Sequence, residues 1–228
     1  MLTPSVKHFI FTPSKPIDYV PGQFITIHIQ RDDKTLRRSY SLASPPSARH
    51  VLEFDAGFVK NGPSTELLFN LKPGDTLETT GPFGRLTLKE ADPARYILMA
   101  TSTGVTPYHA MLPELSKRIK ANPQLRVVIL QGVQTQADLL YQADFLAFAN
   151  QSPQITYRAH LSRATPDSIG DSEHLGYVQT SFPELNLNPE EDIVYLCGNP
   201  GMVDAAFSEL KDKDFAIQRI VREKYISR

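Results

Sequence analysis

Residues 95–107 have the sequence RYILMATSTGVTP, and this stretch predicts how the second half of the chain folds. Its first six residues are mostly apolar, as in strands that are buried on both faces of a sheet. Small and turn-forming residues follow, and residues 108–121 then have the pattern of a helix despite Pro113. We therefore expect a strand, a tight turn at Gly104 and a helix.

The same order of segments recurs toward the C-terminus. Further strand candidates are 125–133 (LRVVILQGV), 154–162 (QITYRAHLS) and 192–198 (DIVYLCG), and a last one is 216–226 (AIQRIVREKYI). Helical patterns fall at 138–150 and 202–213. Strands that alternate with helices at this spacing indicate parallel β-α-β units with helices on both faces of the sheet.

The first ninety or so residues have a different pattern. In QFITIHI (23–29) the isoleucines alternate with polar residues, and Pro-Gly or Pro-Pro pairs separate the short strand candidates. A helix is expected only near 64–71. Such a sequence favours an antiparallel Greek-key β-barrel. We expect two domains, a β-barrel at 1–92 and an α/β domain with a parallel sheet at 93–228.

Composition excludes several classes of function. A formal net charge of −1 gives no reason to expect a nucleic acid or an anionic membrane as partner. A single cysteine excludes an intrachain disulfide and a cluster held by four thiolates of this chain. The N-terminus lacks a signal peptide, no run is apolar enough to span a membrane, and the histidines lack metal-ligand spacing. We expect a soluble, cytoplasmic, monomeric protein without a metal.

The segment RRSYSLAS (37–44) combines cations, an aromatic ring and hydroxyls at the end of a strand. On a strand, Arg38 and Tyr40 point to one side and Ser39 and Ser41 to the other. A guanidinium binds phosphate, a tyrosine ring stacks on planar groups, and a serine hydroxyl donates to a ring nitrogen. These residues fit a phosphorylated heterocycle, and they equally fit an exposed edge strand with arginines for solubility.

Three turns have the composition of phosphate-binding loops. TSTGVTP (101–107) and LCGNPGM (196–202) each follow a buried strand, and NGPSTELL (61–68) leads into a helix. Backbone N–H groups at a helix start bind anions where small residues allow close approach. Each turn alone is equally consistent with ordinary packing and capping, and Cys197 alone with a buried small hydrophobic residue.

Together the segments resemble the ferredoxin–NADP reductase superfamily, in which a flavin-binding barrel precedes a pyridine-nucleotide domain. Eight motifs occur in the family's order and at its usual spacings. They are PGQF, RRSYSLAS, KPGD, GPFG, TGVTP, DLLY, CGNPGM and REKY. The resemblance covers nearly the whole chain.

The resemblance implies a role for each matched residue. In the flavin site, Arg38 binds the phosphate, Tyr40 stacks on the isoalloxazine, and Ser41 bonds near N5, the atom that receives hydride. The flavin phosphates are cradled by Gly62, Ser64 and Thr65. The nucleotide pyrophosphate is lined by Thr103, Gly104, Thr106 and Pro107. The groups expected near the nicotinamide are Cys197, Gly198 and the C-terminal acid Glu223, and Tyr225 is expected to cover flavin or adenine.

The choice of nucleotide depends on LSRA (161–164), which resembles the family's Ser-Arg signature for the 2′-phosphate of NADP. Arg163 offers a planar fork and Ser162 a hydroxyl, so NADPH is favoured over NADH. A second basic residue is missing, since Tyr177 lies where one is expected. Ser102 also replaces an expected glycine. Residues 2–9 usually follow a first strand in this family, so either the barrel is one strand short or the start is internal to a longer product.

The resemblance implies a flavoprotein that passes hydride from NADPH to FAD, with FMN less favoured, and then electrons to a separate ferredoxin or flavodoxin. A second possibility is an NAD(P)H:flavin reductase or an oxygenase-linked reductase. A third, of another class, is a regulatory subunit that keeps the fold and controls electron supply. Retained Arg38, Tyr40, Ser41 and Cys197 argue against the third.

Overall fold

The structure is a computed structural model that describes residues 1–31, 34–46, 50–91 and 93–226. Contacts between Cα atoms divide these residues into two compact units. The first comprises residues 1–88 together with 106–111, and the second comprises residues 89–105 and 112–226. Antiparallel sheets in the N-terminal part and a parallel sheet in the C-terminal part confirm the expected fold class.

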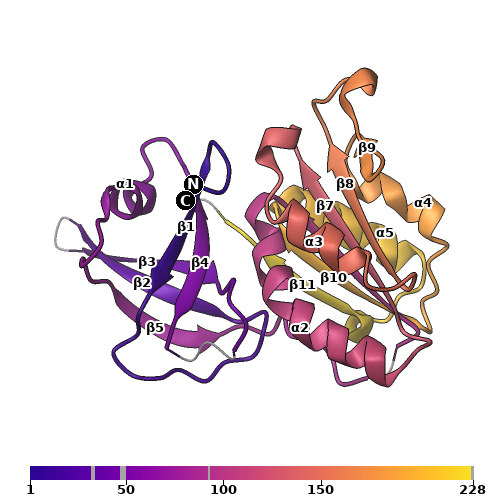
Figure 1. Ribbon diagram of the computed structural model, residues 1–228, viewed down its shortest axis with the longest axis horizontal. Coiled ribbons are helices and arrows are strands. Elements are labelled where there is room, and N and C mark those ends of the chain that lie inside the picture. Colours follow the sequence, from indigo (N-terminus) through magenta and orange to yellow (C-terminus); the bar gives the residue numbers. More distant parts are fainter. Residues whose placement is uncertain (32–33, 47–49, 92, 227–228) are drawn as a thin grey trace. The chain divides into compact units, whose positions relative to one another are not determined.

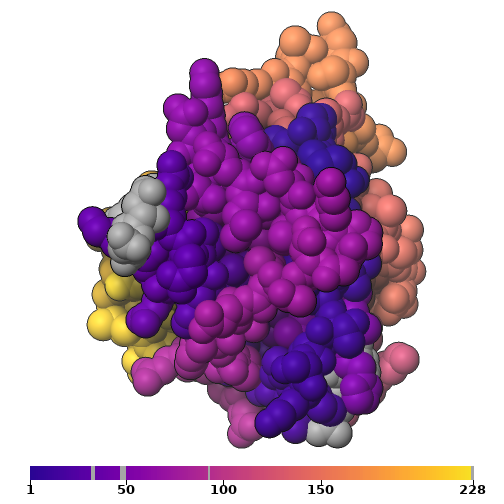
Figure 2. Space-filling view, turned by 90° about the vertical axis from the view of Figure 1, so that its left-hand side faces the viewer, coloured from indigo at the N-terminus to yellow at the C-terminus, as the bar shows by residue number. Residues whose placement is uncertain are grey.

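The first unit contains two small antiparallel sheets (Figure 1), and Figure 2 shows residues of this unit in space-filling form. In one, β1 (Val6–Phe11) pairs with β4 (Leu52–Gly57). In the other, β2 (Phe24–Arg31) lies between β3 (Lys34–Ser41) and β5 (Glu78–Phe83). A bridge between Leu42 and Phe54 joins them, and the helix α1 (Pro63–Asn70) follows β4. Because every second residue of β2 is apolar, Ile25, Ile27 and Ile29 enter the core of this unit.

The second unit is built on a six-stranded parallel sheet with the order β11-β10-β6-β7-β8-β9 (Figure 1). Its strands are β6 (Arg95–Thr101), β7 (Arg126–Val133), β8 (Ile155–Leu161), β9 (Glu173–Leu175), β10 (Asp192–Gly198) and β11 (Ile220–Lys224). The strand order reverses between β6 and β10. In open parallel sheets, ligands bind beyond the carboxyl ends of the strands at such a point.

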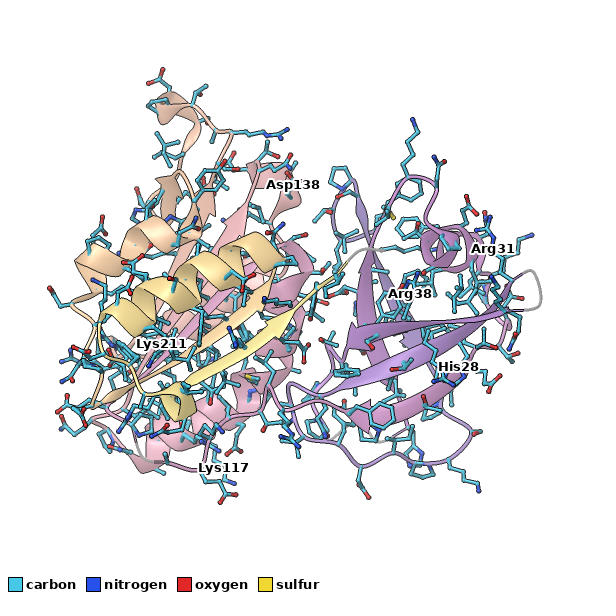
Figure 3. All side chains as sticks on the ribbon, turned by 180° about the vertical axis from the view of Figure 1, so that it is seen from behind. His28, Arg31, Arg38, Lys117, Asp138 and Lys211 are labelled. Atoms are coloured by element: carbon cyan, nitrogen blue, oxygen red, sulfur yellow. The ribbon has the colours of Figure 1, made fainter. Side chains whose placement is uncertain are left out.

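Helices cover both faces of this sheet, as the alternating pattern predicts. They are α2 (Thr106–Ala121), α3 (Gln142–Ala149), α4 (Phe182–Leu185) and α5 (Pro200–Asp212). In Figure 1, α3 lies in front of the sheet, and Figure 3 shows α5 in front of the opposite face. The residues of β6, β7 and β10 are almost all buried, because both of their faces are covered.

Two details differ from the sequence expectation. The second helix begins at Gln142 rather than near 138, because Tyr141 adopts a left-handed conformation with φ of 55°. The strand β9 was not predicted, because three residues with two charged or titratable side chains carry no apolar pattern. Among the described residues, no helix has the length and apolar character needed to cross a membrane.

Candidate functional site

Pairing between β2 and β3 sets the direction of the Arg-x-Tyr-Ser side chains. Arg38 lies opposite Ile27 and Tyr40 opposite Ile25. Directly paired residues of an antiparallel sheet share a face, so both side chains lie on the face that carries the core isoleucines. Both are partly exposed. Ser39 pairs with Thr26 on the outer face, where their hydroxyls are 3.2 Å apart.

Tyr40 is held between the core and the start of α1. Its ring centroid is 5.0 Å from that of Phe54, and its hydroxyl is hydrogen-bonded to the hydroxyl of Ser64. Burial raises the pKa of Tyr40, so the phenol is neutral at neutral pH. Arg38 lies near enough to oppose that shift electrostatically. The structure thus brings Arg38, Tyr40 and Ser64 together from β3 and α1.

A tight turn precedes α1. The Thr65 hydroxyl lies 2.7 Å from the Val59 carbonyl and 2.9 Å from that of Gly62. A Cβ at Gly62 would lie 2.9 Å from the Val59 carbonyl oxygen, so only glycine fits there. Among the residues that the structure describes, no side chain caps this helix, and its first N–H groups have no intrahelical acceptor. Gly62, Ser64 and Thr65 therefore form a helix start that suits a phosphate, with the Thr65 hydroxyl used to shape the turn.

A buried carboxylate lies in the same unit. Asp55 of β4 is 2.8 Å from Nδ1 of His8 and accepts a 2.5 Å hydrogen bond from the hydroxyl of Thr106. The hydrogen bond between His8 and Asp55 is the main cause of the raised pKa of His8. Thr106 is buried, as are Pro107 and Ser41. The hydrogen bond from the Thr106 hydroxyl to Asp55 therefore fixes the start of α2. The sequence did not reveal Asp55 as the partner of Thr106.

In the second unit, the loops after β6 and β10 approach each other through their backbones. A Cβ at Gly104 would lie 2.4 Å from the carbonyl oxygen of Cys197. Gly198 has φ of 118°, and a Cβ there would lie 2.6 Å from both oxygens of Thr101. The Thr101 hydroxyl also accepts a 2.8 Å hydrogen bond from the backbone of Asn199. Glycine is thus required at both predicted positions.

The two helix starts at this edge differ. Asn199 caps α5, because its side-chain oxygen accepts hydrogen bonds from the N–H groups of Gly201 and Met202. In the described part of the chain no side chain caps α2, and the short helix Ser102–Val105 leads directly into it. The first N–H groups of this short helix, including that of Thr103, have no intrahelical acceptor. The loop after β6 is therefore the better phosphate cradle of the two.

Cys197, Glu223 and Tyr225 lie together at the ends of β10 and β11. Cys197 pairs with Glu223 across the sheet, and the backbone N–H of Tyr225 donates to Gly198 at 2.8 Å. The thiol is fully buried and is hydrogen-bonded to the Tyr225 side chain. Burial raises the pKa of Cys197 well above its ordinary value, and Glu223 raises it further. The thiol is therefore neutral at neutral pH.

The Ser-Arg pair follows β8 at the same edge of the sheet. Backbone bonds from Ser162 to Val133 (3.0 Å) and from Arg163 to Gln134 (2.9 Å) fix the turn. The Arg163 side chain is exposed. A 3.0 Å bond from the Gly176 N–H to the Leu161 carbonyl brings the chain after β9 alongside, and Tyr177 there is 66% exposed. A cation and an open aromatic ring thus lie on adjacent strand ends.

Three residues that shape the candidate site were missed by the sequence reasoning. They are Asp55, Thr101 and Asn199. Asn199 was detectable, because Asn before Pro-Gly at a helix start is a capping signal. The other two depend on long-range contacts, which a sequence pattern does not contain.

Comparison with known proteins agrees with this geometry. Residues 2–88 match the oxidoreductase FAD-binding domain family, and residues 98–207 match the oxidoreductase NAD-binding domain family. Ferredoxin–NADP reductase B of Sorangium cellulosum (strain So ce56) is 32% identical over 186 residues, which cover 81% of this chain and 74% of that protein. The chain belongs to the ferredoxin–NADP reductase family.

Relatives with other electron acceptors are also similar. The anthranilate 1,2-dioxygenase electron transfer component of Acinetobacter baylyi (strain ATCC 33305 / BD413 / ADP1) is 29% identical over 213 residues, which cover 93% of this chain and 60% of that protein. The crystal structure of Amycolatopsis cytochrome P450 reductase GcoB has a TM-score of 0.86 at 26% identity, and the match covers 99% of this chain and 66% of that one. The chain is therefore an oxidoreductase of the electron-transfer type, with FAD and NAD(P)H as its cofactors.

Substitution of Gly104 by alanine is expected to raise the KM for NADPH by at least tenfold while FAD stays bound. The added Cβ would overlap the Cys197 carbonyl, and both loops must then move apart. Steady-state kinetics with ferricyanide as acceptor measures the change. Gly170→Ala is the matched control, since its nearest neighbour would be 3.9 Å away. An unchanged KM in Gly104→Ala would show that the loop after β6 does not bind the nucleotide.

Proposed function

We propose that this protein oxidises NADPH and passes the electrons singly to a separate ferredoxin- or flavodoxin-like carrier. The observation that carries the proposal is the exposed Arg163 beside Ser162 at the end of β8. A guanidinium there suits the dianionic 2′-phosphate that distinguishes NADPH from NADH. The single cysteine means only that these 228 residues hold no iron–sulfur cluster bound by four of their own thiolates.

The residues that would hold the flavin come from β3 and α1. Arg38 would pair with its phosphate, the start of α1 at Gly62 and Ser64 would donate backbone N–H groups, and the Tyr40 ring would stack on the isoalloxazine. Ser41 stays the proposed partner of flavin N5. When bound, FAD accepts a hydride and releases electrons one at a time, which joins a two-electron donor to a one-electron carrier.

The residues of the second unit would bind and orient the nicotinamide nucleotide. The Thr103 and Gly104 backbone would hold the pyrophosphate, and Cys197, Gly198 and Glu223 would border the nicotinamide. Because the Cys197 thiol is neutral, it contributes bulk and a weak donor rather than a nucleophile. Tyr225 would cover the flavin or the adenine. Catalysis then rests on positioning and the exclusion of water, since hydride transfer needs no general base.

A second candidate is a reductase that serves an oxygenase. The similarity to the dioxygenase electron transfer component favours it, since that protein is 29% identical over 93% of this chain. The two candidates differ in their acceptor only. Purified ferredoxin, flavodoxin and oxygenase components, offered to the same NADPH-reduced protein, would separate them by their reduction rates.

Anaerobic stopped-flow reduction tests the proposal. The purified protein is expected to be yellow and to lose its flavin absorbance rapidly with NADPH and at least tenfold more slowly with NADH at equal concentration. Equal rates of flavin reduction with NADPH and NADH would show that Arg163 does not recognise the 2′-phosphate. A protein that stays colourless with added FAD would overturn the flavin site.

Cys197→Ala is expected to slow flavin reduction by roughly three- to tenfold and to leave FAD bound. Loss of the buried thiol leaves a small cavity beside the proposed nicotinamide position, and misplacement of a reacting ring lowers the rate. Single-turnover stopped flow gives the rate, and the absorbance spectrum gives the flavin content. Cys197→Ser, which keeps the volume, serves as the matched variant. An unaltered rate in both would assign this thiol to packing alone.

A further inference from the structure

One face of β8 carries a row of polar side chains, and two of them contact residues of the segment Tyr177–Leu185. Arg158 donates to Glu184 of α4 at 2.9 Å, and two residues on, His160 is 2.7 Å from the hydroxyl of Ser181. The next residue of the row is Ser162, beside the exposed Arg163. The segment Tyr177–Leu185 comprises the short helix Val178–Ser181 and α4. We call it the 177–185 segment.

The 177–185 segment is also packed against the sheet by apolar contacts. Val178 lies so near Gly132 of β7 that a Cβ on this glycine would be 3.0 Å away. Phe182 is 1% exposed and belongs to the same core cluster as Val178. Tyr177, at the start of the segment, is open to solvent next to the Ser-Arg turn. The position of Tyr177 therefore depends on how firmly the rest of the segment is held.

His160, which contacts Ser181 of this segment, is a buried histidine with a ring nitrogen that is unsatisfied in the described part of the chain. It is 4% exposed, and its Nδ1 is the one buried side-chain polar atom without a hydrogen-bond partner among the described residues. The His174 ring stacks on it, with centroids 5.2 Å apart. A neutral imidazole has one donor and one acceptor, so the Ser181 bond uses only one of them. An imidazolium needs two acceptors, and Nδ1 has none here.

The charges around His160 also oppose its protonation. Burial, together with the smaller effects of the nearby His174 and Arg158, lowers the pKa of His160 to about 4. Glu184, the carboxylate on this face, is paired with Arg158 and is largely exposed. The neutral form is therefore the form that holds Ser181. Stability from this group is present above pH 6.5 and is lost as the pH falls toward 4, because the released histidine binds the proton more tightly.

We propose that His160 is a positioning residue for the adenosine end of the nucleotide site, and that its protonation releases the 177–185 segment and so weakens nucleotide binding in mild acid. The second part of the inference rests on the proposed function, in which Arg163 binds the 2′-phosphate of the nucleotide. Tyr177 lies beside the Ser-Arg turn and would contact the same end of the nucleotide. Release of the segment itself depends on β8 and the short helix alone. The ion pair between Arg158 and Glu184 does not depend on His160 and stays in place. The release is therefore confined to this segment, and the rest of the second unit stays folded.

Hydrogen exchange measured by mass spectrometry tests the release directly. The opening constant for peptides that cover 177–185, corrected for the intrinsic exchange rate, is expected to rise roughly thirtyfold between pH 8 and pH 5. This factor follows from a pKa of about 4 when the segment is closed and the ordinary 6.5 when it is open. Peptides of α5 should show no such change.

Variants assign the effect to one side chain. His160→Gln keeps an amide near the position of Nε2 and cannot titrate, so its opening constant should not vary between the two pH values. Ser181→Ala removes the bond and keeps the histidine, so the segment should exchange faster already at pH 8. His50→Gln, in the first unit and exposed, is the control. Equal pH dependence in the wild type and in His160→Gln, or opening of the whole unit at once, would overturn the proposal.

Equilibrium binding of NADP+ by calorimetry tests the second part. The affinity of the protein for NADP+ is expected to fall more between pH 8 and pH 5 in the wild type than in His160→Gln. The titration of the phosphate of NADP+ itself affects both proteins equally. Identical falls would show that the segment does not serve the nucleotide. Absence of NADP+ binding at pH 8 would instead overturn the proposed function, while the exchange result still decides the release.

Discussion

Replacement of Arg38 by alanine is expected to lower the affinity for FAD roughly a hundredfold. A charge-assisted hydrogen bond contributes about 1.5–3 kcal/mol, and a bidentate guanidinium–phosphate pair reaches the upper end of that range. The loss is expected in a folded protein, because the Arg38 side chain is partly exposed and belongs to the middle of β3 (Figure 3). Flavin content after gel filtration and FAD titration by fluorescence quenching measure it.

Arg37→Ala is the control for this experiment. The two arginines are adjacent and equally charged, yet Arg37 pairs with His28 on the outer face of the sheet. An effect of net charge on FAD affinity would appear in both variants, whereas a bond from Arg38 to the flavin phosphate would appear in one. Equal flavin occupancy in Arg38→Ala and the wild type would show that the phosphate is bound elsewhere.

Replacement of Arg163 by alanine is expected to raise the KM for NADPH roughly thirtyfold and to leave that for NADH within about twofold. Loss of about 2 kcal/mol corresponds to this factor, and it falls on NADPH alone because NADH lacks the 2′-phosphate. Steady-state kinetics with both nucleotides and ferricyanide measures the change. A similar increase for both would leave the 2′-phosphate without a partner at this turn.

Tyr177→Ala distinguishes recognition of the phosphate from recognition of the adenosine as a whole. The exposed ring lies beside the Ser-Arg turn and would stack on the adenine that both nucleotides share. We expect the KM to rise three- to tenfold for NADPH and for NADH alike. A change confined to NADPH would indicate that Tyr177 acts by holding Arg163 in place.

The order of the elements was predictable because the periodicity of apolar residues changes near residue 92. Alternation in QFITIHI places isoleucines in the core of the first unit, and continuous apolar runs mark strands covered on both faces. The strand β9 and the left-handed Tyr141 were not predictable in this way. The strand β9 depends on contacts with distant residues, such as those of the Glu173 carboxylate with Gln136 and Gln142.

The same limit applies to the site. Arg38, Tyr40, Gly104 and Gly198 were proposed from residue type, residue order and the family resemblance. The structure shows the close backbone approach that requires glycine at Gly104 and Gly198. The bond from Thr106 to Asp55 was not, since the two are 51 positions apart in the chain. His160 gave no signal either. A histidine in an apolar strand is usually a packed side chain, and its missing partner appears only in three dimensions.

The two edge strands of the parallel sheet bear on self-association. An exposed strand edge offers unpaired backbone groups to another molecule, and long apolar edges lead to aggregation. Here β9 is only three residues long, and β11 carries the exposed cations Arg222 and Lys224. A second copy of the sheet would meet a strand of only three residues at one edge and charged side chains at the other, where Lys224 is paired with Asp204. Concentrated protein is therefore protected against growth of the sheet from molecule to molecule.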